Sequence, residues 1–258
     1  MTAATLDRAA VLLGRPGAEQ VPGQLDHSQA SSRTGFPLPA RPWNGLTVLD
    51  VFCCQGGASM GYYLAGYDVV GVDKEDQPRY PFPFIQGDAI EYILAHGHEY
   101  DLIAGSPPCQ RYTNAQRIRG NTHPDLVGPT RAAMDATGRP WIIENVEGAP
   151  LLDTVLLCGA MFRLRTYRHR LFESSLPLGS RLHPRHLAPV AKMGRPVRAG
   201  EFMHIVGNFT GADLAREIMA MPWASREGLR EAIPPAYAKF LGDQAAALIL
   251  ADRAEVAA

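Results

Sequence analysis

From residue 46 onward, the chain alternates short apolar runs with segments whose apolar positions recur at helical spacing. Near-continuous apolar runs such as residues 67–73 are typical of strands buried on both faces of a sheet. Residues 57–65, 89–95 and 129–136 have the spacing of helices that cover one face. The expected strands are residues 46–52, 67–73, 84–86, 101–105, 141–144 and 168–173. This alternation predicts an α/β fold with a mostly parallel sheet and right-handed crossovers.

The same pattern divides the chain into four regions. Residues 1–45 combine a short apolar stripe with a stretch rich in Gly, Pro, Ser and Gln, which is typical of a disordered tail or linker. Residues 46–173 form the expected α/β domain. Residues 174–212 have no clear period and are expected to be a small appended lobe. Helical spacing returns over residues 213–258, which we expect to pack back on the α/β domain, most strongly over residues 235–250.

Composition narrows the class of protein. A chain of 258 residues and 28.1 kDa accommodates one large domain, or one domain with a small lobe. Its 46% apolar and 20% charged residues are ordinary for a globular protein, and no apolar run is long enough to cross a membrane. Four cysteines, two of them adjacent, do not make a disulfide framework. Together with the absence of a secretory signal pattern, they favour a reducing, intracellular compartment.

Positive charge is concentrated in two segments, although the formal net charge is only -1. Residues 163–198 hold nine Lys or Arg and one acid, Glu173. Residues 109–131 hold four arginines and one acid, Asp125. Charge alone leaves two interpretations open. Either these segments form a face that binds a polyanion, or they are two solvated loops.

Three strand ends predict a ligand crevice. The first expected strand leads into Gln55, Gly56 and Gly57, and a helix follows this glycine turn. The next two strands end at Asp73 and just before Asp88, where carboxylates can accept hydrogen bonds from a ribose or an amine. Each residue alone is compatible with ordinary turn chemistry. Together, without a full G-x-G-x-x-G motif, they favour an adenosine-containing cofactor over a dinucleotide.

The ends of the later strands carry candidate catalytic residues. Two prolines precede Cys109 at the end of the fourth strand, where they stiffen the turn and direct the thiol. A lone cysteine is more often a small buried apolar residue, but the Pro-Pro pair and the arginine-rich loop favour a nucleophile. Glu144 ends the fifth strand and could retain its proton if partly buried. Arg168 and Arg170 alternate along an expected strand, so we expect both to point to one face.

These motifs, in this order, resemble those of the DNA cytosine-5 methyltransferase family. The resemblance covers residues 46–250 and is closest to the compact members found in actinobacterial phages and prophages. It implies the Rossmann-like fold of class I S-adenosylmethionine-dependent methyltransferases, an intracellular monomer, double-stranded DNA as partner and no membrane association. The motifs that carry it are Phe52–Gly57, Pro107-Pro108-Cys109-Gln110, Glu144-Asn145-Val146, Arg168-His169-Arg170 and Ile233–Tyr237.

The resemblance also implies a mechanism. The target cytosine is flipped out of the duplex, and the Cys109 thiolate attacks carbon 6 of its ring. Protonated Glu144 holds ring nitrogen 3, while Arg170, with Arg168, binds the carbonyl oxygen of the base. Carbon 5 then takes the methyl group of S-adenosylmethionine.

The implied binding residues fall into two sets. In the cofactor site, Phe52 packs on the adenine, Asp73 holds the ribose, Asp88 accepts from the adenine amine and Pro107 lines the methyl-donor side. The remaining cofactor-loop residues are Cys53, Gln55, Gly56 and Gly57. The expected nucleic-acid contacts are Arg111, Arg117, Arg119, Arg181, Arg185, Lys192 and Arg195.

Several positions depart from the family pattern. Cys54 stands where the cofactor loop usually has a glycine, which predicts a slightly different backbone path. Thr166 replaces a glutamine, and Arg230 and Glu231 replace a Gly-Asn pair. The lobe of about forty residues is much shorter than usual. It therefore predicts a short or relaxed target sequence, with phosphate contacts supplying most of the affinity.

Other interpretations remain open. A related reaction on RNA cytosines fits the small lobe, and a larger donor group fits the altered loop at Cys54. A non-catalytic DNA-binding relative is disfavoured by the intact Cys109 and Glu144. The sequence does not show whether a partner subunit supplies specificity. His183 and His186 resemble a metal-binding pair, but without a nearby Cys-x-x-Cys motif we expect a basic loop and no metal.

Overall fold

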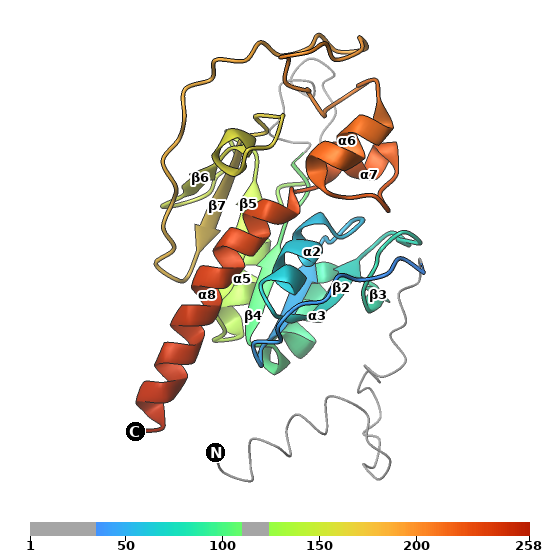
Figure 1. Ribbon diagram of the computed structural model, residues 1–258. Helices are drawn as coiled ribbons and strands as arrows, with labels where there is room; N and C mark the ends of the chain where they lie inside the picture. Colours follow the sequence, from blue (N-terminus) through green and yellow to red (C-terminus); the bar gives the residue numbers. More distant parts are fainter. Residues whose placement is uncertain (1–34, 110–123) are drawn as a thin grey trace.

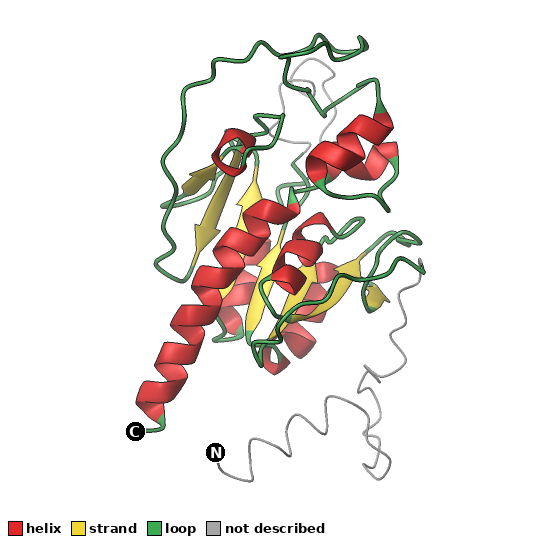
Figure 2. Cartoon of the chain, in the orientation of Figure 1, coloured by secondary structure: helices red, strands yellow, loops and turns green. Residues whose placement is uncertain are grey.

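The structure, a computed structural model, describes residues 35–109 and 124–258. Its centre is a seven-stranded sheet of order β3-β2-β1-β4-β5-β7-β6 (Figures 1 and 2). The neighbouring pairs from β3 to β5 are parallel, and β7 runs antiparallel to both β5 and β6. The strands are β1 Thr47–Val51, β2 Asp68–Asp73, β3 Phe84–Gln86, β4 Leu102–Gly105, β5 Trp141–Asn145, β6 Val155–Leu157 and β7 Arg170–Ser174. The expected Rossmann-like, mostly parallel sheet is confirmed.

Helices cover both faces of the sheet (Figure 1). Helices α2 and α8 pack together on one face, and α3 and α5 lie together on the other. The helices are α2 Gly57–Leu64, α3 Ala89–His96, α5 Val127–Ala136, α6 Ala212–Met219, α7 Arg226–Glu231 and α8 Pro235–Val256, with short 3₁₀ turns at η2 Gly97–Glu99 and η4 Gly159–Phe162. None of the helices in the described ranges combines the length and apolar character that a membrane span requires.

Strands in the middle of the sheet are buried on both sides, which explains their near-continuous apolar runs. In β1, Val48 packs with the α2–α8 core, whereas its neighbour Leu49 packs with the α3–α5 core. In β5, Ile142 and Ile143 divide in the same way. Successive side chains on a strand point to opposite faces, so a strand between two helical layers is apolar throughout.

The ordered part begins before Leu46. Phe36 packs against Trp223, with 5.1 Å between the ring centroids. Arg41 forms an ion pair with Asp68 at 2.5 Å and donates a hydrogen bond to the carbonyl of Gly66. These contacts attach this stretch to the domain, although the sequence pattern assigns it to the linker. Neither the charge nor the spacing of the stretch identifies its distant partners.

Residues 175–211, here called the irregular segment, connect β7 to α6. They contain no helix or strand, only an isolated bridge between Val190 and Phe202. In Figure 1 the segment arches over the end of the sheet at which β5 finishes. Its lack of regular structure agrees with its lack of a hydrophobic period.

Candidate active site

The turn after β1 has an unusual backbone. Phe52, Cys54 and Gly56 have positive φ angles of 56°, 47° and 78°. This left-handed region favours glycine, so the cysteine at position 54 is held in the conformation that a glycine adopts without strain. The Cys54 N–H donates to Asp73 Oδ2 at 2.9 Å, which ties the turn to the end of β2.

Two carboxylates flank this turn at the carboxyl ends of adjacent strands. Asp73 Oδ1 accepts from the N–H of Glu75 at 3.0 Å. Asp88 caps α3, since its Oδ1 accepts from the N–H groups of Ile90 and Glu91 at 2.9 and 3.1 Å. These bonds hold both side chains in place at the strand ends where the sequence predicts a ligand crevice.

The remaining cofactor-loop residues contact the C-terminal helices. Cys53 is buried, with 6% of its surface exposed. Gln55 accepts from the Ser225 N–H at 2.8 Å, and its backbone carbonyl accepts from Trp223 Nε1 at 2.7 Å. A methyl group added at Gly57 would lie 2.3 Å from the carbonyl oxygen of Ile233. The side chains of Cys53 and Gln55 therefore shape the turn.

Two of the departures from the family pattern meet in space. Cys54 Sγ donates to Glu231 Oε2 at 3.5 Å, although the residues are 177 positions apart. Burial, and then the charge of Glu231, raise the pKa of the Cys54 thiol. The thiol at this edge of the crevice is therefore protonated and bound to a carboxylate.

The candidate catalytic residues come from three neighbouring strands. Cys109 follows β4, Glu144 lies in β5 and Arg170 begins β7. Arg170 Nε and Glu144 Oε1 form an ion pair at 2.8 Å, and both side chains are largely buried. Asn145 Nδ2 donates to the carbonyl of Pro107 at 2.9 Å, which fixes the turn that leads to Cys109.

Electrostatics link these groups. Burial, and then the charge of Glu144, raise the pKa of Cys109, while Arg170 and Arg168 lower it less. Burial also raises the pKa of Glu144, against the opposing effects of Arg170 and Arg168. Burial therefore shifts both groups toward their protonated forms, and the two arginines oppose this shift.

Arg168 does not lie beside Arg170 on one strand face, so that expectation is wrong. Strand β7 begins at Arg170, and Arg168 precedes it with a φ of 34°. The Arg168 guanidinium donates to three backbone carbonyls, those of Ala232, Ile205 and Arg230, at 2.8, 2.6 and 2.8 Å. Burial lowers its pKa to about 9, with a smaller contribution from Arg170. It joins β7 to the irregular segment and the α7–α8 connection.

The expected nucleic-acid residues are in different environments. Arg111, Arg117 and Arg119 lie outside the described residues. Arg181 lies over the rings of Phe162 and Phe240, at 5.1 and 5.7 Å. The side chains of the other three, Arg185, Lys192 and Arg195, are exposed on the irregular segment.

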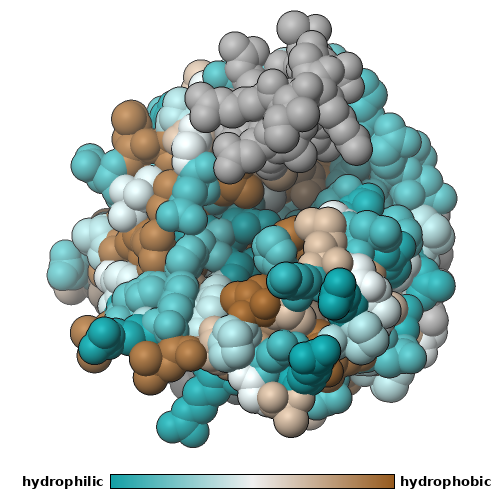
Figure 3. All heavy atoms as spheres, turned by 90° about the horizontal axis from the view of Figure 1, so that it is seen from above, coloured by the Kyte–Doolittle hydropathy of each residue, from teal (hydrophilic) through white to brown (hydrophobic). Residues whose placement is uncertain are grey.

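A cavity of about 630 Å³ opens between β7 and the irregular segment. Arg170 and Tyr167 line one side, and Val190 and His204 line the other. Seen from above in Figure 3, this end of the molecule is mostly hydrophilic, with separate apolar patches. Such a hollow beside Arg170 is large enough to admit a nucleobase.

Comparison with known proteins identifies methyltransferases. The chain is 31% identical over 125 residues to the type II methyltransferase M.HgiGI of Herpetosiphon aurantiacus, covering 41% of this chain and 94% of that protein. It is 30% identical over 121 residues to M.HgiDI of the same organism, covering 41% of this chain and 38% of that protein. The match thus spans well under half the length of M.HgiDI. No protein-family model matches the sequence.

Among solved structures, the S. pombe Dnmt2 methyltransferase is similar with a TM-score of 0.38 and 15% identity, over 55% of this chain and 52% of that one. An Agrobacterium tumefaciens SAM-dependent methyltransferase has a TM-score of 0.27 at 20% identity, over 42% and 39%. Scores this low carry no argument about chemistry.

Proposed function

This chain belongs to the type II methyltransferase family, and we propose that it transfers a methyl group to carbon 5 of cytosine in DNA. The observation that carries the proposal is the buried pair of Glu144 and Arg170, joined at 2.8 Å next to the strand end that bears Cys109. A nucleophile, an acid and a cation grouped in this way suit addition to a pyrimidine ring.

The crevice beside β1 and β2 suits S-adenosylmethionine. Gly56 has a φ of 78°, and a methyl group added there would lie 3.0 Å from Tyr80 and Pro81, so only glycine leaves the turn this close to its neighbours. Asp73 would accept from the ribose and Asp88 from the adenine amine, while the Phe52 ring would cover the base. When bound, S-adenosylmethionine supplies an electrophilic methyl group.

Cys109 provides the nucleophile. Its thiolate forms a bond to carbon 6 of a flipped cytosine, and the electron pair of the 5,6 double bond moves toward ring nitrogen 3. Protonated Glu144 donates its proton at that nitrogen. Arg170 binds the carbonyl oxygen and offsets the negative charge that builds on the ring. Once carbon 5 has taken the methyl group, ring nitrogen 3 returns its proton to Glu144. A solvent water then accepts the carbon 5 proton, the 5,6 double bond reforms and the thiolate is released.

Arg168 acts as a positioning residue in this scheme. Its guanidinium donates to three backbone carbonyls, so it holds the chain around Arg170 without touching the base. Buried donors that satisfy three carbonyls fix a backbone more firmly than one contact would.

The decisive experiment supplies labelled S-adenosylmethionine with unmodified double-stranded DNA and, separately, RNA, and identifies the labelled nucleoside by mass spectrometry. We expect 5-methyldeoxycytidine, no product with Cys109→Ala, and a loss of about 100-fold or more with Glu144→Gln. Lys239→Ala, on the surface of α8, is the control outside the proposed chemistry. Label in RNA alone would move the substrate class to RNA. Label on an exocyclic amine, or label that persists in Cys109→Ala, would overturn the proposal.

A further inference from the structure

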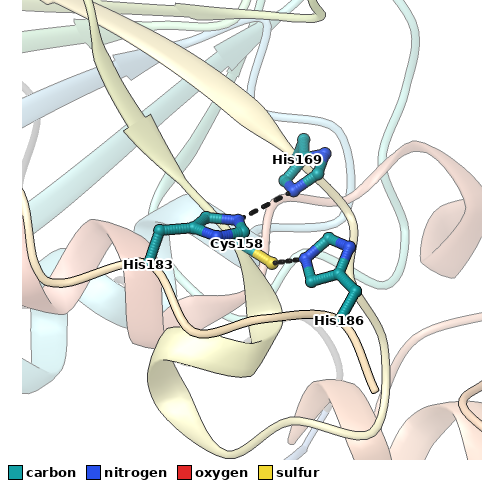
Figure 4. Close-up of side chains that lie close together, drawn as sticks. All are labelled: Cys158, His169, His183 and His186. Carbon is teal, nitrogen blue, oxygen red and sulfur yellow. Dashed lines mark hydrogen bonds between the residues drawn. The ribbon is translucent and has the colours of Figure 1, made fainter. Parts of the chain in front are cut away.

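Four side chains that the proposed reaction does not use converge at the base of the irregular segment (Figure 4). They are Cys158, just before η4, His169, just before β7, and His183 and His186 from the irregular segment. Their candidate ligand atoms, one per residue, all lie within 4.8 Å of one another. Three chain regions, 11 and 14 positions apart, thus bring one sulfur and three ring nitrogens together.

The closest pairs lie at or slightly below the spacing of ligand atoms in a shared coordination sphere. His169 Nε2 and His183 Nε2 are 3.1 Å apart, and Cys158 Sγ and His186 Nε2 are 3.3 Å apart. Ligand atoms around a tetrahedral zinc ion lie roughly 3.3–3.7 Å from one another, given bonds of about 2.0–2.1 Å to nitrogen and about 2.3 Å to sulfur. Small movements would therefore place all four on one ion.

We propose that Cys158, His169, His183 and His186 bind a structural zinc ion. One thiolate and three imidazoles form a borderline-soft, four-ligand set, which suits zinc better than magnesium or calcium. Four protein ligands close the coordination sphere, so the ion is structural. Binding displaces the thiol proton of Cys158, and the sulfur electron pair forms the metal bond.

A second shell supports this assignment. Glu147 Oε2 lies 3.4 Å from Nδ1 of His169, on the opposite side of the ring from the nitrogen that faces His183. A carboxylate in this position orients a metal-bound imidazole and fixes its tautomer. Tyr167 stacks on His186 with 3.6 Å between centroids and 18° between planes, which holds that ring from its face.

The irregular segment needs such a cross-link. It has no helix or strand of its own, and Leu182 and Leu187 beside the two histidines are 93% and 83% exposed. None of residues 175–190 is fully buried, so packing holds this part of the segment weakly, and a metal ion is a usual substitute for packing. Because His169 lies between Arg168 and Arg170, the same ion would fix the start of β7.

The sequence hides this site. His183-Pro184-Arg185-His186 is visible as a pair, but the other two ligands precede it by 14 residues or more and form no familiar spacing. Only the fold brings them together, which is why the sequence pattern alone predicted a basic loop. The zinc assignment holds independently of the proposed methyl transfer, because it rests on these four residues and their neighbours.

Metal analysis of the purified, untagged full-length chain tests the proposal. We expect about one zinc per chain by mass spectrometry, and below about 0.1 in His183→Ala and in His183→Ala/His186→Ala. His183 is exposed, so the single variant should fold, and circular dichroism checks this. His204 is an exposed histidine that lines the cavity beside Arg170 but is not one of the four proposed ligands. His204→Ala should therefore retain the metal. Retention of zinc by the double variant would overturn the proposal.

Cobalt substitution provides a second readout that does not depend on activity. The metal-free, reduced chain titrated with Co²⁺ should develop the intense visible bands of a tetrahedral site and a near-ultraviolet sulfur-to-cobalt band. Cys158→Ser should lose the sulfur band. Failure of the wild-type chain to bind either Zn²⁺ or Co²⁺, or an unchanged spectrum in Cys158→Ser, would show that the four residues form only a hydrogen-bonded cluster.

Discussion

At the residue scale, Cys109 is the group whose protonation limits the proposed chemistry. Burial and the neighbouring Glu144 raise the pKa of its thiol, so the thiolate population grows as pH rises past neutrality. We expect iodoacetamide to alkylate Cys109 more slowly than free cysteine at pH 7, and the rate to rise about tenfold per pH unit up to at least pH 9. Peptide mass spectrometry measures the rate.

Glu144→Gln is the matched variant for this measurement. It removes the carboxylate charge that holds the Cys109 pKa up, so alkylation should be faster than in the wild type at each pH. A rate that is flat between about pH 7 and about pH 9 would mean that the thiolate already exists in the unliganded protein, contrary to the electrostatics of the site.

Asp50 shows a second consequence of burial. Burial, and then the charges of Asp73 and Glu144, raise its pKa from 3.8 to about 7, although the hydrogen bond from Ser59 opposes them. Between these values the unfolded chain releases the proton and the folded chain keeps it, so stability falls as pH rises. The unfolding free energy of the wild type should fall between about pH 4 and about pH 7. In Asp50→Asn, we expect this fall to be smaller than in the wild type by about 2–4 kcal/mol.

Urea unfolding of both proteins at about pH 4.5, pH 6 and pH 8 measures this difference. Thr130→Val is the control, because it alters a buried polar side chain without removing a titratable group. Parallel curves for wild type and Asp50→Asn would contradict the argument.

The sequence predicts the positions of Cys109 and Glu144 in the fold better than it predicts the position of Arg168. Cys109 and Glu144 follow from one rule, that residues at the carboxyl ends of parallel strands share a crevice. The place of Arg168 does not follow from any such rule. Its positive φ and its three carbonyl partners depend on how β7, the irregular segment and α7 pack, which local spacing does not encode.

At the element scale, the contact between α2 and α8 holds the C-terminal helices against the sheet. A methyl group added at Gly61 would lie 2.3 Å from the carbonyl oxygen of Pro235 and 2.6 Å from Ala238 Cβ. We expect Gly61→Ala to force the helices apart and to lower the unfolding free energy by about 1–3 kcal/mol, measured by thermal or urea unfolding.

Gly128→Ala in α5 is its matched control. A methyl group added there meets nothing within 4 Å, and alanine is the better helix former, so we expect a gain of about 0.5–1 kcal/mol. If Gly61→Ala stabilised the protein as Gly128→Ala is expected to, the close approach of α2 and α8 would be contradicted.

The short elements of the fold differed in how well the sequence predicted them. The expected strand over residues 84–86 matches β3, and the helix over residues 89–95 ends one residue short of α3. Strand β6, Val155–Leu157, was missed because three residues at the edge of the sheet carry too little pattern. The strand expected from residue 168 starts at Arg170, since Arg168 turns the chain before the ladder begins.

At the scale of the whole molecule, the proposed DNA-binding face lies at the carboxyl ends of the strands, under the irregular segment (Figure 1). The segment offers few side chains to read bases, and the exposed Lys192 and Arg195 extend from it. Cations that neutralise phosphates release counterions, so their contribution falls as salt rises. Most of the affinity should therefore be electrostatic and independent of sequence.

The double variant Lys192→Ala/Arg195→Ala tests this. We expect weaker binding to every duplex, and a plot of log affinity against log salt that is shallower by about one unit per lost phosphate contact, so by up to about two. Arg139→Ala is the control, because Arg139 lies just before the amino end of β5, whereas the proposed DNA-binding face lies at the carboxyl ends of the strands. Fluorescence anisotropy over a salt series gives both slopes. If the double variant lost affinity for one sequence while keeping the wild-type slope, these two residues would read bases, and the irregular segment would be a compact specificity element.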